Sequence, residues 1–236
     1  MTGTIINAIG IIVGGLLALT LRRQPTATTQ LALKAFLGMA TVFVGLRLTW
    51  LSLGGGFWMV GKQLLILILA LTLGRLTGRL LGLQKAANKL GQYAKQKVSR
   101  SSAASWSEGF STGAILYCAT PLAAIGSILD GLSDQWQPLA VKAVIDGLAT
   151  MAFTTIFGWS IVLAVVPVIA WQGTLALLAR LAVPHLANPA LMDAINATGG
   201  MLVFCVALVI LEIKKIELAD YLPSLLFAPL ITWLWP

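Results

Sequence analysis

Ionisable residues inside long apolar stretches are the first candidates for chemistry in this sequence. Asp146 lies well inside an apolar run that begins near residue 138, and Lys142 precedes it by one helical turn. An ionisable side chain costs at least ~2.5 kcal/mol at the centre of a membrane-spanning helix, so it is a functional candidate by default. Two interpretations stay open: a structural ion pair between helices, or a site for a transported ion or proton.

Other polar residues could complete a site around Asp146. Asn7 and Asn196 both occur in the pattern Ile-Asn-Ala-x-Gly, near the start of an apolar run. Gln172 lies deep in an apolar run beside a glycine. The asparagines could line a polar site at one membrane depth, or they could simply form two interhelical hydrogen bonds.

A proline interrupts the apolar run near residues 108–130. Pro121 has no amide hydrogen and frees carbonyl groups one turn back. Exposed backbone at membrane depth is tolerated only against protein or a water-lined cavity. We therefore expect a broken helix at Thr120, with a simple kink as the alternative. Asp130 ends the same run and could instead cap a helix or face water. The candidate ion- or solute-binding residues are Asn7, Thr120, Pro121, Asp130, Lys142, Asp146, Gln172 and Asn196.

Composition places the chain in a membrane. Hydrophobic residues make up 58% of its 236 residues and charged residues 10%, whereas soluble domains carry about 25% charged residues. We predict an all-α, polytopic transmembrane helical bundle that forms one domain over residues 1–236. The last of its apolar runs is short, so we expect seven to eight spans. The runs cover 4–21, 33–51, 57–82, 108–130, 138–158, 160–181, 193–212 and 222–236.

The formal net charge of +8 is distributed as an orientation signal, and we expect no nucleic-acid partner. Seven of the sixteen Lys and Arg residues lie between Arg75 and Arg100. By the positive-inside rule this connection faces the cytoplasm, and both termini lie outside. Residues 83–104 read as a basic amphipathic segment on anionic lipids, with a solvated linker as the alternative.

An internal similarity links two of the expected spans. The stretch LKAFLGMAT from Leu33 resembles VKAVIDGLAT from Val141 when Asp146 is treated as an insertion. The two spans run in opposite directions by the charge rule. This predicts a 3+3 inverted repeat, residues 1–83 against 105–182, followed by C-terminal helices over 183–236. Chance matching among common small residues is the alternative.

Glycines spaced for close helix contact are numerous. One strip lies one turn apart in the third run, and others accompany the two asparagines, so these faces could pack helices or form a homodimer. They are Gly10, Gly14, Gly74, Gly78, Gly82, Gly199 and Gly200.

An enzyme is not expected. The stretch GFSTG at Gly109 fits a nucleophile motif, but the sole histidine, His185, lies in a distant loop. Cys118 and Cys205 stand in apolar runs without metal-ligand spacing, so we expect neither a metal site nor a cofactor.

Several stretches resemble one bacterial family in this order: GTIINAIGIIVGGLL, IGSILDGLSD, LAVKAVIDGLAT, WQG and KKIELADYLPSLLFAPLI. They resemble the integral membrane family known as domain of unknown function 554, the YqgA/YdfK-like proteins. The likeness covers nearly the whole chain. It implies a protein of the bacterial cytoplasmic membrane and supplies no substrate.

We therefore expect a transporter or channel for a small ion or small polar solute. Its site would lie between the first, fourth, fifth and seventh spans, with Asp146 binding a cation or proton. The alternative is a non-transporting membrane scaffold or regulator that packs through its glycine-rich faces.

Overall fold

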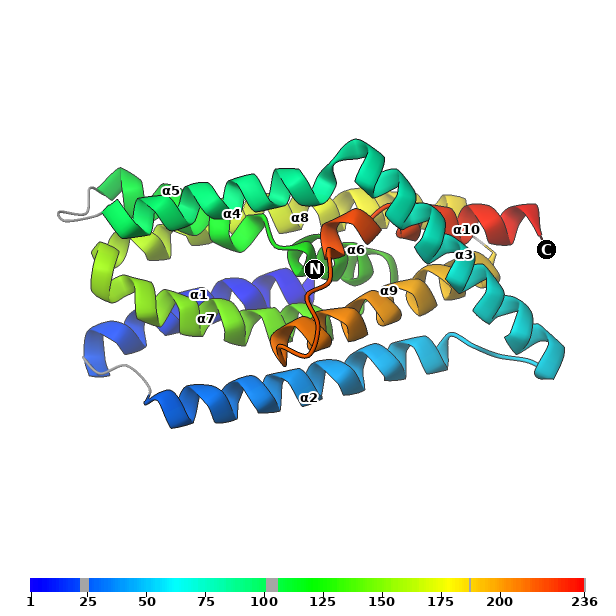
Figure 1. The fold of residues 1–236 in the computed structure, drawn as a ribbon, viewed down its shortest axis with the longest axis horizontal. Coiled ribbons are helices and arrows are strands. Elements are labelled where there is room, and N and C mark those ends of the chain that lie inside the picture. The colour runs from blue at the N-terminus through cyan, green and yellow to red at the C-terminus, as the bar shows by residue number, and fades with distance from the viewer. Residues whose placement is uncertain (22–25, 101–105, 187, 236) are drawn as a thin grey trace. The chain divides into compact units, whose positions relative to one another are not determined.

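A computed structural model describes residues 1–21, 26–100, 106–186 and 188–235. Every regular element within these ranges is a helix (Figure 1). The α-helices are α1 (Thr2–Leu21), α2 (Ala27–Leu51), α3 (Phe57–Leu81), α4 (Leu83–Arg100), α5 (Trp106–Cys118), α6 (Pro121–Ser133), α7 (Gln137–Phe157), α8 (Val165–Ala182), α9 (Pro189–Ile210) and α10 (Ser224–Leu234). Short 3₁₀ segments are η1 (Gly158–Ala164), η2 (Val183–Leu186) and η3 (Leu218–Tyr221).

Five helical segments are long and apolar enough to cross a membrane, and the number rises to six if the bent pair α5–α6 counts as one span. The all-helical membrane class is therefore established, while the count of seven to eight spans is not confirmed. One of the five segments, Gln137–Leu186, contains both α7 and α8. Residues 101–104 of the predicted basic segment lie outside the described ranges, and α4 covers the rest of it.

The chain divides into two compact units. Unit 1 contains Met1–Ala32 and Ala86–Leu178, and unit 2 contains Leu33–Lys85 and Ala179–Pro236. Each unit is therefore assembled from two separate stretches of sequence. The boundaries differ from those of the expected repeats, 1–83 and 105–182, and the inverted repeat is not confirmed.

In unit 1, α1 packs against α7 at backbone distance. A Cβ atom added to Gly3 would meet Leu139, one added to Gly10 would meet Ala143, and one added to Gly14 would lie 2.1 Å from the Gly147 carbonyl oxygen. Contacts therefore advance in the same direction along both helices, which makes α1 and α7 parallel (Figure 1).

The rest of unit 1 encloses an apolar core. Ile11 of α1 and Val168 of α8 meet Tyr117 of α5 and η1 there. Helix α8 runs back antiparallel to α7, because η1 follows the end of α7 whereas Ala176 lies against Gly131, just before α7 begins. This geometry agrees with the two separate apolar runs expected over 138–158 and 160–181.

Unit 2 pairs α2 with α9 in the opposite sense. Gly45 and Gly200 face one another's carbonyl oxygens, and the Thr49 hydroxyl donates to the Ala197 carbonyl over 3.1 Å. Nearer the start of α2, Gly38 lies against Leu211. Residues earlier in α2 therefore contact residues later in α9, which makes the pair antiparallel (Figure 1).

Helix α3 contacts η3 and the start of α10 through glycines. A Cβ atom at Gly74 would lie 2.5 Å from the Ser224 amide, and one at Gly78 would lie 2.0 Å from the Asp220 carbonyl oxygen. Gly82 differs from the expected packing strip: nothing lies within 4 Å of its added Cβ atom, and it ends α3 with a left-handed φ of 67°. This conformation favours glycine and explains its presence there.

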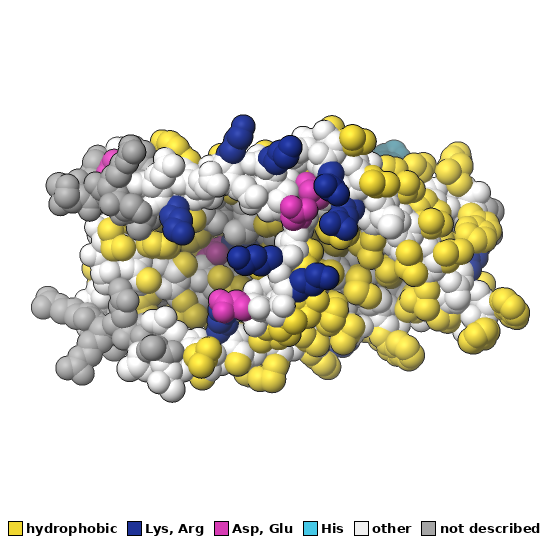
Figure 2. Space-filling model, viewed as in Figure 1, with side chains coloured by type: hydrophobic (Ala, Val, Ile, Leu, Met, Phe, Trp, Pro, Cys, Tyr) yellow, Lys and Arg dark blue, Asp and Glu magenta, His cyan; other side chains and the backbone are white. Residues whose placement is uncertain are grey.

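The surface of unit 2 has the pattern of a membrane protein. Near the α2–α3 connection, Trp50 is 76% exposed and Phe57 and Trp58 are each 87% exposed. Figure 2 shows hydrophobic side chains covering this part of the surface, while Lys, Arg, Asp and Glu side chains gather toward the other end of α3, near η3. Large exposed apolar and aromatic side chains are stable against lipid and unfavourable in water.

Candidate functional site

Helix α7 places two opposite charges in the interior of unit 1. Lys142 and Asp146 stand one turn apart, and the Lys142 ammonium donates to Asp146 Oδ2. Only 2% of Lys142 and 4% of Asp146 is exposed. Removing two charges from water costs several kcal/mol per ion, and only close pairing with further hydrogen bonds offsets that cost.

Asn7 supplies such a hydrogen bond from another helix. Its side-chain amide donates to Asp146 Oδ2 over 3.2 Å. This reach depends on the close backbone approach at Gly10 and Gly14, which brings α1 next to α7. The Asn7 oxygen is buried and has no hydrogen-bond partner in the described part of the chain. One carboxylate oxygen thus joins two helices, and an unused acceptor lies beside it.

The broken helix lies next to the same turn of α7. Helix α5 ends at Cys118, α6 begins at Pro121, and their axes differ by 61°. Proline at the first position of α6 is favourable because that position needs no amide hydrogen. One residue before the end of α5, the buried Tyr117 hydroxyl lies 2.8 Å from that of Thr150. Thr150 in turn donates to the Asp146 carbonyl oxygen over 2.7 Å.

Thr120 and Pro121 themselves are half-buried. Cys118 is near enough for the charges of Lys142 and Asp146 to act on its thiol. The break therefore belongs to the surroundings of the ion pair. The carbonyl groups at the end of α5 add partial negative charge there through the helix dipole.

Gln172 is the most unusual buried polar residue of unit 1. Its side chain is fully buried, and neither its oxygen nor its nitrogen has a hydrogen-bond partner among the described residues. Val168, one turn earlier, packs in the core with Ile11, and the adjacent Gly173 approaches Met1. Gln172 therefore lies near the first two turns of α1. A buried amide without partners costs about 1–3 kcal/mol unless water or a ligand satisfies it.

Asp130 lies at the start of α1. Its Oδ2 accepts a hydrogen bond from the Gly3 amide over 3.1 Å, and its Oδ1 has no partner in the described ranges. A carboxylate at this position satisfies a free amide and interacts favourably with the helix dipole. The geometry matches the capping alternative.

The predicted set is thus gathered only in part. Asn7, Lys142 and Asp146 are bonded to one another, and Thr120, Pro121, Asp130 and Gln172 belong to the same unit. Asn196 is buried on α9 of unit 2, so its shared depth with Asn7 stays a prediction.

Sequence reasoning missed three polar residues that the structure adds to this unit. Thr150 follows Asp146 by one turn, so its place on the same face was readable from spacing. Tyr117 and Thr4 carried no comparable signal. The buried Thr4 hydroxyl has no hydrogen-bond partner among the residues the structure covers.

Comparison with known proteins gives one family. The family model described as "Protein of unknown function (DUF554)" matches residues 2–233. An "Uncharacterized membrane protein YdfK" from Bacillus subtilis (strain 168) is 29% identical over 98% of this chain and 95% of its own length. An "Uncharacterized protein YqgA" from Escherichia coli (strain K12) is 28% identical over 99% of this chain and 97% of its own length. No solved structure gives a significant match.

Proposed function

The chain belongs to the membrane protein family described as Protein of unknown function (DUF554). We propose that unit 1 binds a small cation or proton at Asp146. It then passes this ion across the membrane, alone or with a small polar solute. The observation that carries the proposal is the buried Asp146 carboxylate, whose Oδ2 is shared by the Lys142 ammonium and the Asn7 amide. No enzymatic step is part of the proposal.

The Lys142 ammonium acts as a built-in competitor. When it pairs with Asp146, the site is closed and electrically neutral. A proton or a small cation that reaches the carboxylate takes the place of the ammonium, which then needs another acceptor or loses its own proton. Binding of the transported ion is thus coupled to movement of Lys142.

Neutral groups of unit 1 supply the remaining coordination. The Asn7 oxygen and the Gln172 amide are buried and lack hydrogen-bond partners among the described residues. The end of α5 adds carbonyl groups at the break before Pro121. Oxygen groups of this kind replace the hydration shell of an ion, and ends of broken helices commonly serve this purpose in transporters.

The wider arrangement that we propose follows the charge distribution. It keeps seven to eight spans, an inverted repeat, both termini outside the cytoplasmic membrane and α4 on anionic lipids. Close helix packing at Gly10, Gly14, Gly199 and Gly200 would hold together the core of each unit. Because Ser224 and Asp220 cover Gly74 and Gly78 within unit 2, a homodimer would use another surface.

Flux through reconstituted protein tests the proposal. Proteoliposomes containing the full chain would be given opposing gradients of pH, Na⁺ and K⁺, and ion movement would be followed with entrapped dyes. We expect Asp146→Asn to abolish flux and Lys142→Met to alter its pH dependence, because the competitor for Asp146 is removed.

Asp134→Asn is the matched control. Asp134 is exposed and ends α6 with φ 53°, a conformation that asparagine also adopts readily. This variant should transport as the wild type does. Wild-type flux in Asp146→Asn, with the protein correctly folded and inserted, would refute the role of Asp146.

A non-transporting scaffold is the second candidate, and one observation favours it. The charge of Asp146 is already neutralised by Lys142 within a tightly packed helix pair. On this view the ion pair only fixes how α1 and α7 dock. Replacing both residues, as Lys142→Met with Asp146→Leu, would then leave every cellular and in vitro function intact.

A further inference from the structure

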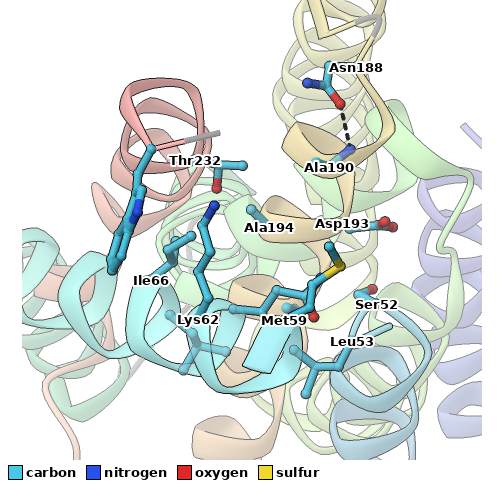
Figure 3. A pocket seen from close by; sticks show the side chains of 14 residues that line it. Ser52, Leu53, Met59, Lys62, Ile66, Asn188, Ala190, Asp193, Ala194 and Thr232 are labelled. Carbon is cyan, nitrogen blue, oxygen red and sulfur yellow. Dashed lines mark hydrogen bonds between the residues drawn. The ribbon is translucent and has the colours of Figure 1, made fainter. Parts of the chain in front are cut away.

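A cavity and a groove lie near the connection between α2 and α3 in unit 2, and Leu53 lines both of them. The cavity has a volume of about 210 Å³ and lies where α3 and α9 begin and α10 ends (Figure 3). Of its charged residues, Asp193 is exposed, and the Lys62 ammonium lies 5.5 Å from the centre of the Trp235 ring, which attracts a cation. Neither of these charges therefore requires a ligand.

The groove runs along one face of α2 and has a volume of about 690 Å³. Met39, Phe43, Leu46 and Trp50 follow one another along it at intervals of three or four residues, which is the spacing of one helix face. All four side chains are exposed. Hydrocarbon chains of lipid are the surroundings in which such a face is stable.

One charged side chain stands on this apolar face. In the described part of the chain, Arg47 is the only charged residue that lines the groove. Its side chain is exposed, and it forms no hydrogen bond or ion pair with any residue in the described ranges. The guanidinium therefore obtains no counter-charge from the described residues.

The position of Arg47 in α2 places it inside the bilayer rather than in bulk water. The segment Thr28–Leu51 is long and apolar enough to cross a membrane, and Arg47 precedes Leu51 by one turn, about 6 Å. The exposed Trp50 lies nearer to the end of α2, where tryptophan is typical of the membrane–water interface. A guanidinium just inside this level is costly without an anion, and its long side chain extends toward the headgroups.

We propose that this groove binds an anionic phospholipid. The Arg47 guanidinium pairs with the phosphate through two N–H groups, and an acyl chain lies along Phe43 and Met39 toward the bilayer centre. A single positive charge complements a lipid of net charge −1, such as phosphatidylglycerol. Phosphatidylethanolamine also carries an ammonium, for which the described lining offers no carboxylate. The site is independent of the ion site at Asp146, because all of its lining residues belong to unit 2.

This lipid site differs from the lipid contact proposed above for α4. Helix α3 spans 25 residues between the connection that follows α2 and the start of α4. Because α3 is long enough to cross the membrane, Arg47 and α4 serve opposite membrane surfaces. A lipid that contacts α4 therefore does not reach Trp50.

Fluorescence quenching at Trp50 tests the proposal. The purified full chain would be placed in phosphatidylcholine nanodiscs that contain phosphatidylglycerol or phosphatidylethanolamine with brominated acyl chains. The difference between the wild type and Trp50→Phe gives the signal of Trp50. We expect brominated phosphatidylglycerol to quench this signal at an about fivefold lower mole fraction than brominated phosphatidylethanolamine, which is about 1 kcal/mol.

Arg47→Gln should make the two brominated lipids equally effective. Arg180→Gln is the matched control, because Arg180 is an exposed basic residue of the same unit, in the last turn of α8 and outside the groove. It should keep the wild-type preference. Equal quenching by the two lipids in the wild type, or equal loss of preference in the two variants, overturns the proposal. If Arg47→Gln fails to fold, the comparison of the two lipids on the wild-type chain decides alone.

A second copy of the chain is the competing occupant of the groove. Native mass spectrometry of the wild type, released from the same nanodiscs, distinguishes the two. Monomers that retain phosphatidylglycerol, and lose it in Arg47→Gln, support the lipid site. A dimer that Arg47→Gln dissociates, with Trp50 shielded from both brominated lipids, assigns the groove to a second copy and overturns the proposal.

Discussion

Each unit contains a helix with the sequence Ile-Asn-Ala packed against a helix with Lys-Ala and a later Ala-Thr. The two units differ in where the charged side chains lie. In unit 1 the pair α1–α7 is parallel, and Lys142 is buried against Asp146. In unit 2 the pair α9–α2 is antiparallel, and the corresponding Lys34 binds the exposed Glu212 beyond the end of α9. The residue that makes the difference is Asp146, which has no counterpart in α2. The interior ion pair thus occurs where the helix carries one extra carboxylate and where the two packed helices are parallel.

Removing the interior carboxylate should destabilise the protein more than any other change considered for the two units. Asp146→Ala leaves the Lys142 charge buried and unpaired, so we expect the free energy of unfolding to fall by about 3–5 kcal/mol. Glu212→Ala, the same change in unit 2, should have a much smaller effect because water solvates both partners. Unfolding by denaturing detergent in mixed micelles measures both variants. Equal losses in the two variants would remove the distinction between the units.

A methyl group at the contact of α1 and α7 should have the next largest effect. In Gly14→Ala the new Cβ atom would lie 2.1 Å from the Gly147 carbonyl oxygen, so the helices must separate, at a cost of about 1–3 kcal/mol. Gly61→Ala is the control, because nothing lies within 4 Å of its added Cβ atom. The same unfolding assay applies, and a Gly14→Ala protein as stable as the control would show that the contact is loose.

The hydrogen bond from Asn7 should contribute less. We expect Asn7→Ala to cost about 0.6 kcal/mol, the average for interhelical hydrogen bonds in membranes. Double-mutant cycles separate the two units: Asn7→Ala should be non-additive with Asp146→Ala, its direct partner, and additive with Thr49→Ala in unit 2. Additivity in both cycles would mean that the Asn7–Asp146 bond adds no stability.

The smallest effect concerns the surface pair of unit 2. The hydrogen bond from Lys34, together with its charge, lowers the pKa of Glu212. A carboxyl group with a lowered folded-state pKa stabilises the fold above its unfolded pKa and loses this effect as the pH falls through the folded value. Lys34→Ala should therefore raise the pKa of Glu212, and Lys215→Ala should not. Carbon-detected NMR titration measures the pKa of the Glu212 carboxyl group. Equal pKa shifts in the two variants would exclude a specific Lys34–Glu212 pair.

Local patterns predicted much of the fold and part of the site. The apolar run 57–82 became α3 (Phe57–Leu81), because its length and its terminal glycine fix the helix ends. Thr120 and Pro121 marked the break between α5 and α6, and the four-residue spacing of Lys142 and Asp146 placed them on one face. These features depend on neighbours in the sequence, which a single sequence displays.

Features that depend on distant partners were predicted only in outline. The sequence analysis placed Asn7 and Asp146 in one site, but their direct hydrogen bond joins residues 139 apart, and no local pattern specifies it. Asp193 stands at the head of the second Ile-Asn-Ala pattern, but its place in a cavity depends on α3 and α10.

The division of unit 1 into two stretches of sequence has a consequence for how the protein is made. Helix α1 leaves the ribosome first, while α7 follows after α3 and most of α2, which belong to unit 2. At about 5–20 residues per second, the 139 residues between Asn7 and Asp146 correspond to a delay of roughly 7–28 s. During that interval α1 enters the bilayer with its glycine face uncovered and without its permanent neighbour. The contact between α1 and α7 therefore forms only after the helices between them in the sequence have been synthesised.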